Sequence, residues 1–125
     1  MSDFDKPNAR RWTRSKYDSM GYDELFNEVK KWHEDRGLID GSSDKDQCLK
    51  LMQELGELSD DICSDLYNDL TDSLGDMLVV MINIMVRNDL NMLHCLRKAL
   101  VEIQDRKGHN LDGVFIKDKV DIIIE

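Results

Sequence analysis

The sequence has few cysteines and no long apolar segment. Its three cysteines stand singly in helix-like segments with no CxxC pair, which argues against both a disulfide framework and a zinc knot. No leader of charged and then apolar residues opens the chain, and Asn83 interrupts the longest apolar run before it could span a bilayer. We therefore expect reduced thiols and a cytoplasmic protein.

Positive charge is also scarce. Seventeen lysines and arginines stand against 26 acidic residues, which gives a net charge of -9. Such a chain repels nucleic-acid backbones and anionic membranes, so we expect neither as a partner. No GxxxxGK[ST] sequence is present, which excludes phosphate binding by a P-loop.

The chain is short enough for one main domain. Residues 1–21 hold the only proline and show no sustained period, so they are predicted to form an N-terminal arm. Residues 22–108 are predicted to form an all-α four-helix bundle, because amphipathic segments follow one another with short connections. Residues 109–125 are assigned to a C-terminal tail, whose state is left open between extended segments and an arm on a neighbouring chain.

Apolar residues at helical spacing define the four expected helices. They cover residues 22–36, 45–63, 72–87 and 92–106. Gly37 is expected to end the first helix and Asp44 to cap the second. The second helix has an apolar stripe that is predicted to be its buried face: Cys48, Leu51, Met52, Leu55, Leu58 and Ile62.

Polar residues on the third helix stand in a segment that otherwise reads as core. Asp72, Asp76 and Asn83 lie one and two turns apart along one side of it. A buried carboxylate without a partner would cost several kcal/mol, so it must be paired, hydrogen-bonded or bound to a metal.

The second helix offers a matching set of acids. Glu54 and Glu57 flank its apolar stripe, with Lys50 and Asp61 on the same edge, although an exposed charged edge would look similar. If the second and third helices pack antiparallel, the acids of both can converge. Carboxylates about 5 Å apart repel by roughly 3 kcal/mol per pair at an effective dielectric constant of about 20. An all-oxygen cluster of this kind favours Mg²⁺ or Mn²⁺, which take phosphate oxygens as further ligands.

The segment "ELGEL", followed after a spacer by "DSLGDMLVVMINI", resembles the MazG-like all-α nucleoside triphosphate pyrophosphohydrolases, in their short and often phage-encoded branch. Their signature is ExxE, a spacer, then ExxD on two facing helices. The ExxE matches Glu54 and Glu57, the final Asp matches Asp76, and a later Asn matches Asn83. The resemblance covers about residues 22–117.

One position departs from that signature. The acid of ExxD would be residue 73, which is a serine in this chain. Asp72, one residue earlier, is the candidate replacement. The expected metal ligands are therefore Glu54, Glu57, Asp72 and Asp76.

The resemblance implies metal-dependent hydrolysis of a nucleoside triphosphate to the monophosphate and pyrophosphate. Glu54 or Glu57 would orient the attacking water or accept its proton. Lys98, Arg106 and Lys107 are candidates to neutralise the leaving group, the alternative being that they are solvated surface.

Trp32 and His33 precede a glycine-containing loop and are candidates for contacts with the nucleobase. The sequence is equally consistent with Trp32 as a residue of the hydrophobic core. The resemblance slightly favours dGTP or another deoxynucleotide as the substrate. Two alternatives remain: a pyrophosphohydrolase of the phosphoribosyl-ATP type, and a non-catalytic acidic helical bundle that binds a partner protein.

Assembly is the last expectation. The third helix is apolar on more sides than one helix pair can cover, and the resemblance implies a dimer or tetramer. Val79, Ile82 and Val86 are predicted to meet a second copy of the chain. If the protein is phage-encoded, it would act in the host cytoplasm.

Overall fold

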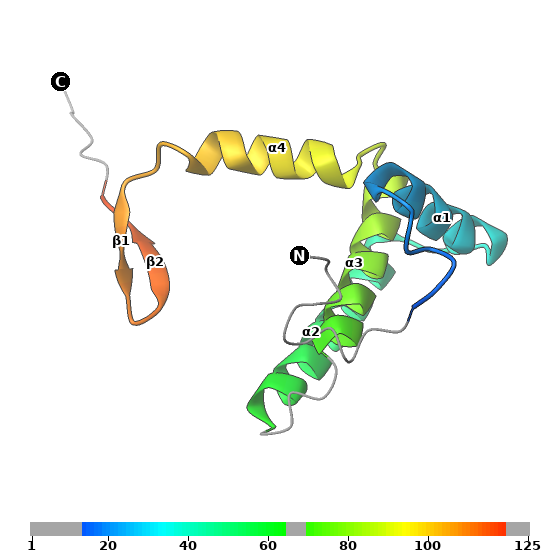
Figure 1. The fold of residues 1–125 in the computed structure, drawn as a ribbon, viewed down its shortest axis with the longest axis horizontal. Helices are drawn as coiled ribbons and strands as arrows, with labels where there is room; N and C mark the ends of the chain where they lie inside the picture. Colours follow the sequence, from blue (N-terminus) through cyan, green and yellow to red (C-terminus); the bar gives the residue numbers. More distant parts are fainter. Residues whose placement is uncertain (1–13, 65–69, 120–125) are drawn as a thin grey trace. The chain divides into compact units, whose positions relative to one another are not determined.

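The computed structural model describes residues 14–64 and 70–119. In this part of the chain it contains four helices and one small sheet (Figure 1). The elements are α1 (Tyr22–Asp35), α2 (Asp44–Cys63), α3 (Leu70–Arg87), α4 (Met92–Ile103), β1 (Gly108–Leu111) and β2 (Val114–Lys117). The mainly helical fold is confirmed, and the two-stranded sheet is an addition to the expected all-α class.

The chain divides into two compact units at the start of α4. The first ends at Met92 and contains α1, α2 and α3; the second begins at Leu93 and contains nearly all of α4 and the hairpin. The expected domain 22–108 therefore includes parts of both units. Packing of all four helices into one bundle stays a prediction.

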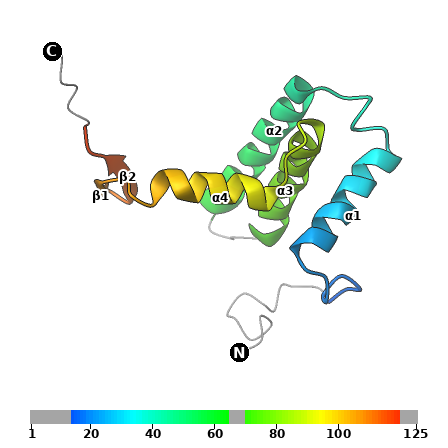
Figure 2. The same ribbon diagram turned by 90° about the horizontal axis from the view of Figure 1, so that it is seen from above.

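Helices α2 and α3 lie side by side and antiparallel in the first unit (Figures 1 and 2). Two contacts set their register. Near one end, Ser73 of α3 donates a hydrogen bond to the carboxylate of Asp61. At the other end, the Arg87 Nε atom lies 3.1 Å from Oδ1 of Asp44. The antiparallel packing that the acidic cluster requires is therefore present.

The ends of α1 and α2 follow from local chemistry. Gly37 adopts a φ of +67° just after α1, as expected for a residue that ends a helix. The N-cap of α2 is Ser43, whose Oγ atom accepts a hydrogen bond of 3.1 Å from the backbone N–H of Asp46. The expectation of an Asp44 cap is wrong by one residue, because the Asp44 side chain is used in the ion pair with Arg87 instead.

The stripe on α2 that was predicted to be buried is largely exposed. Leu51 and Leu58 are half-buried, whereas the other four members are exposed. The buried residue of α2 is an acid, Glu54. In the part of the chain that the structure describes, the buried apolar residues are Val80, Ile82 and Met85 of α3. The expectation that Ile82 faces a second chain is therefore wrong, since only 5% of it is exposed.

The second unit contains a hairpin, in a segment whose state the sequence alone does not predict. β1 and β2 pair antiparallel from Gly108 opposite Lys117 to Leu111 opposite Val114. Asp112 and Gly113 connect them with φ values of 51° and 88°. Positive φ at both positions suits a tight hairpin turn, and "DG" is its usual sequence signal.

Within residues 14–64 and 70–119, no helix is both long enough and apolar enough to cross a membrane.

Candidate metal centre

Three acidic side chains meet where α2 packs against α3. Glu54 and Glu57 come from successive turns of α2, and Asp76 comes from α3. One carboxylate oxygen of each lies within 4.8 Å of the others. Glu54 is buried, Asp76 is half-buried and Glu57 is exposed, so the group runs from the interior to the surface. Three convergent carboxylates of this kind could hold a hard divalent cation such as Mg²⁺ or Mn²⁺.

Glu54 is the most constrained member of the group. Only 6% of it is exposed. Its Oε1 atom lies 3.2 Å from the Nζ atom of Lys50, whose side chain is about half exposed. Its Oε2 atom is buried and has no hydrogen-bond partner. An unsatisfied buried acceptor costs about 1–3 kcal/mol, and more when it is charged, so this oxygen is suited to bind a cation.

The charges of the cluster act on Glu57. The negative charge of Glu54 is the main reason that the pKa of Glu57 is raised above its ordinary value. Asp76 adds to this rise in pKa, whereas Lys50 opposes it. In the metal-free site Glu57 therefore holds its proton to a higher pH than an isolated glutamate does, and a bound cation would oppose this rise in pKa.

This raised pKa predicts how stability changes with pH in the absence of metal. The folded chain binds the proton of Glu57 more tightly than the unfolded chain does, so the stability gained is fully present below the unfolded pKa of about 4.5. It is lost as the pH rises through the folded value. We expect Glu57→Gln, which cannot ionise, to become more stable relative to the wild type as the pH increases from about 4 to about 8.

Urea unfolding of both proteins in a chelator at several pH values measures this difference. Glu102→Gln, at an exposed position of α4, is the control and should show no such trend. A constant difference in the free energy of unfolding between Glu57→Gln and the wild type would contradict the electrostatic account.

The fourth predicted ligand is not a member of this group. Asp72 lies in the first turn of α3 and is exposed. Ser73, at the position where the ExxD signature has its first acid, is buried instead and donates its hydroxyl hydrogen bond to Asp61 of α2. From its spacing, Asp61 shares the edge of α2 with Glu54 and Glu57, but no role is predicted for it from the sequence.

Two of the expected substrate-binding residues are buried and bonded to each other. Asn83 is 0% exposed, and its Nδ2 atom donates to Nδ1 of His33 at 3.2 Å and to the carbonyl of Leu38 at 3.1 Å. Because Nδ1 accepts, the imidazole proton is on Nε2, which donates to the carbonyl of Val79 at 2.9 Å. This network joins α1 and the following loop to α3. A role for His33 or Asn83 in substrate binding stays a prediction.

The network predicts a stability effect that is separate from the metal centre. Asn83→Ala would leave the acceptors of His33 and Leu38 without their donor, and we expect it to lower the free energy of unfolding by roughly 2 kcal/mol. Chemical denaturation measures the change. Asn88→Ala, at an exposed position near the end of α3, is the control and should cost less. An Asn83→Ala chain as stable as the wild type would contradict this account.

Trp32 is partly available for stacking. It is 44% exposed, and the guanidinium of Arg36 lies 4.2 Å from the centre of its ring. A nucleobase that stacked on this indole would have to use the other face of the ring or displace Arg36. The alternative that Trp32 is simple core does not hold within the single chain.

The expected basic residues all belong to the second unit. Lys98 lies in α4, and Arg106 and Lys107 lie between α4 and β1. All three are exposed. Their role at the leaving group stays a prediction.

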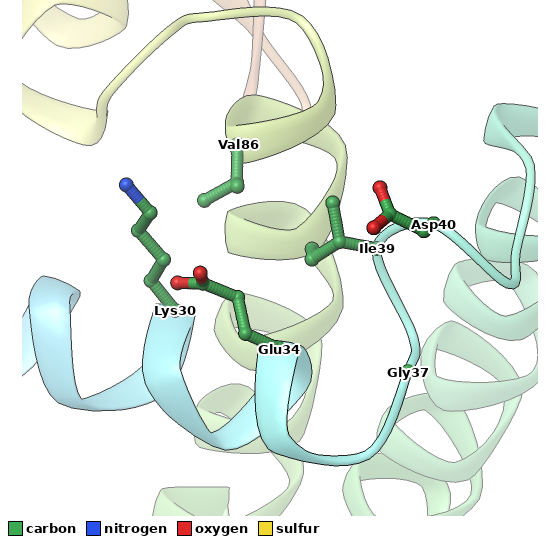
Figure 3. A pocket seen from close by; sticks show the side chains of 6 residues that line it. All are labelled: Lys30, Glu34, Gly37, Ile39, Asp40 and Val86. Carbon is green, nitrogen blue, oxygen red and sulfur yellow. The ribbon is translucent and has the colours of Figure 1, made fainter.

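A separate pocket of about 410 Å³ lies among α1, the loop that follows it and α3 (Figure 3). Its lining residues are Lys30, Glu34, Gly37, Ile39, Asp40 and Val86. None of the predicted site residues lines it. The cluster of Glu54, Glu57 and Asp76 on α2 and α3 is therefore a better candidate for a functional site than this pocket is.

Comparison of the chain with protein-family models, with curated protein sequences and with solved structures gives no match.

Proposed function

We propose that the protein is a metal-dependent pyrophosphohydrolase of nucleoside triphosphates, with Glu54, Glu57 and Asp76 as ligands of Mg²⁺ or Mn²⁺. The observation that carries the proposal is the buried, unpartnered Oε2 atom of Glu54 beside two further carboxylates. A side chain that only formed a solvated edge would keep both oxygens in water. The resemblance of the ExxE and the later Asp to the MazG-like enzymes supplies the reaction class.

The carboxylates have different roles in the proposed reaction. When bound, the cation polarises the phosphate oxygens and lowers the pKa of a coordinated water. Glu54 is fixed by burial and serves as a ligand. Glu57 is exposed, and its ionised carboxylate accepts the proton of the water that attacks the α-phosphorus. The bond between the α-phosphorus and the bridging oxygen breaks, and pyrophosphate leaves with the negative charge of that oxygen.

The direct test is pyrophosphate release by the full chain from the eight common ribo- and deoxynucleoside triphosphates, with Mg²⁺ and separately with Mn²⁺. We expect a monophosphate and pyrophosphate as the products, and dGTP is the favoured first substrate. Phosphoribosyl-ATP in the same assay tests the related alternative. Release of orthophosphate, or no release with any of these substrates, would contradict the proposed reaction.

A non-catalytic helical bundle that binds a partner protein is the second candidate. The exposed apolar residues of α2, including Met52 and Leu55, favour it. The two candidates differ in their response to metal. A true metal centre is stabilised by about 2.7 kcal/mol when free Mg²⁺ is about 100 times its Kd, whereas a bundle without the site is not.

We also propose that the working form is a homo-oligomer, either a dimer or a tetramer. Large apolar side chains are exposed along α2 and α3 in the single chain: Leu49, Met52, Leu55, Ile62, Leu74, Leu78 and Met81. Apolar surface of this extent on neighbouring helices is typical of an interface between subunits.

A further inference from the structure

The pocket among α1, the loop that follows it and α3 is lined by both charged and apolar side chains (Figure 3). Lys30 and Glu34 belong to α1, and Asp40 belongs to the loop. Ile39 and Val86 supply apolar surface. The volume of about 410 Å³ lies within the range of about 300–1,000 Å³ that is usual for small-molecule sites. The pocket therefore suits a small ligand that has both charged groups and an apolar part.

The charged side chains of the pocket are unpaired, although two of them stand at a spacing that favours pairing. Lys30 and Glu34 are four residues apart on α1, as are Lys31 and Asp35. The second pair forms an ion pair of 3.0 Å. Among the described residues, the side chains of Lys30, Glu34 and Asp40 take part in no hydrogen bond or ion pair. One positive and two negative groups can therefore interact with a ligand in this pocket.

The backbone on both sides of Asp40 is held in place from α3. The guanidinium of Arg87 donates hydrogen bonds to the carbonyls of Ile39 and Ser42. One wall of the pocket is therefore fixed by a side chain of a neighbouring helix.

Two glycines give the same loop a defined shape. The backbone N–H of Gly41 donates to the carbonyl of Gly37 at 2.9 Å, and Gly37 has a φ of +67°. A Cβ atom at Gly41 would lie 2.5 Å from the carbonyl oxygen of Gly37, so any other residue at this position would require the loop to move. Because the loop is already ordered, a ligand loses little free energy in shaping the pocket.

The arrangement of the charges indicates the chemical class of the ligand. In the view of Figure 3, Lys30 and Asp40 lie on opposite sides of the pocket, with Glu34 and Ile39 between them. A ligand with an amine alone would be repelled by Lys30, and a ligand with an acid alone would be repelled by Glu34 and Asp40. A molecule that carries both charges is complementary to both sides.

We propose that this pocket binds a small aliphatic zwitterion, in which a protonated amine and a carboxylate are joined by a short methylene chain. The amine lies at Asp40 and Glu34, and the carboxylate lies at Lys30. The methylene groups contact Ile39 and Val86. This inference does not depend on the proposed metal centre, since none of the three clustered acids lines the pocket.

The test is isothermal titration calorimetry of the full chain in a chelator with 4-aminobutanoate and with 6-aminohexanoate. We expect at least one of the two to bind with a Kd below about 1 mM. Hexylamine and hexanoate each carry only one of the two charges, and we expect them to bind at least about tenfold more weakly. The inference is wrong if neither zwitterion binds, or if hexylamine or hexanoate binds as tightly as the zwitterion does.

Substitutions locate the binding site. Asp40→Asn and Lys30→Gln should each weaken binding of the zwitterion by about fivefold or more. Asp35→Asn and Lys31→Gln are the matched controls, because they remove the same charges from neighbouring positions of α1 that face each other in an ion pair. Both controls should bind as the wild type does. All four positions are exposed, so the unfolding temperatures should not change. Gly41→Ala, which displaces the loop, should also weaken binding.

Unchanged affinity in Asp40→Asn and Lys30→Gln would overturn the inference, because the zwitterion would then bind elsewhere. Weakening of the same size in Asp35→Asn and Lys31→Gln would overturn it as well, because that result would reflect the charge of the whole chain rather than the pocket.

Discussion

Glu54→Gln is expected to reduce pyrophosphate release by at least about 10²-fold and to raise the unfolding temperature of the metal-free chain. The two effects have the same origin. Glu54 is buried next to two other carboxylates, so its charge is unfavourable until a cation binds. Glutamine has nearly the same shape, removes the charge and offers an amide donor to Glu57. The expected rise in unfolding temperature is about 2 to 4 °C.

Both effects are measured on the same preparations, by an assay of pyrophosphate release with Mg²⁺ and by thermal unfolding in a chelator. The variant should also lose the stabilisation by Mg²⁺ that the wild type shows. Gln53→Glu, an exposed change on the same turn of α2, is a control for altered charge alone. Full activity in the Glu54→Gln variant would show that the proposed metal centre is not the active site.

The burial of α2 explains why a metal and a second chain are proposed together. Its buried residue is the acid Glu54, while Leu55 on the next position is 53% exposed. Neither arrangement is favourable for an isolated helix pair, because a charge is removed from water and an apolar side chain is left in it. The proposed cation would offset the first cost, and the proposed neighbouring subunit would offset the second.

The helices could be predicted from the sequence because periodicity is a local property. The observed bounds of α2 and α3 differ from the expected ones by at most two residues. The cap of α2 was misplaced because Ser43 and Asp44 both suit that position, and the choice depends on Arg87 of a distant helix. The hairpin had a usable signal in Asp112 and Gly113, which the short apolar strands obscured.

The acidic group could be predicted in part. Spacing along each helix places Glu54, Glu57 and Asp76 on single faces, and antiparallel packing brings those faces together. The alignment of residue 73 with Asp61 could not be derived in the same way, because it depends on the register between α2 and α3. Sequence neighbours alone suggested Asp72, which is exposed.

The faces of the helices were the least predictable feature. An apolar stripe marks a surface that is removed from water, but it does not say whether the same chain or another one covers it. The stripe of α2 was assigned to the interior of the chain and is largely exposed, whereas Ile82 was assigned to an interface and is buried. Both predictions, for the stripe of α2 and for Ile82, failed because the apolar pattern does not identify which chain covers it.

This reversal gives the second prediction, in which two similar substitutions have different consequences. Ile82→Asp would place an unpaired carboxylate in the interior of the first unit, at a cost of several kcal/mol, and we expect the chain to unfold. Leu55→Asp adds the same charge at an exposed position of α2. We expect it to keep its helices and to dissociate the oligomer, with activity lost together with assembly.

Circular dichroism measures the helix content of both variants, and sedimentation velocity at micromolar concentration measures the mass of Leu55→Asp against the wild type. Lys45→Asp is the matched control, because it adds negative charge to an exposed, polar position at the start of α2. It should keep both the assembly and the fold.

A wild-type chain that sediments as a fully active monomer would defeat the proposed assembly. A folded Ile82→Asp chain would show that residue 82 is not in the core, and a Leu55→Asp chain of unchanged mass would mean that the exposed stripe of α2 is not the contact between subunits.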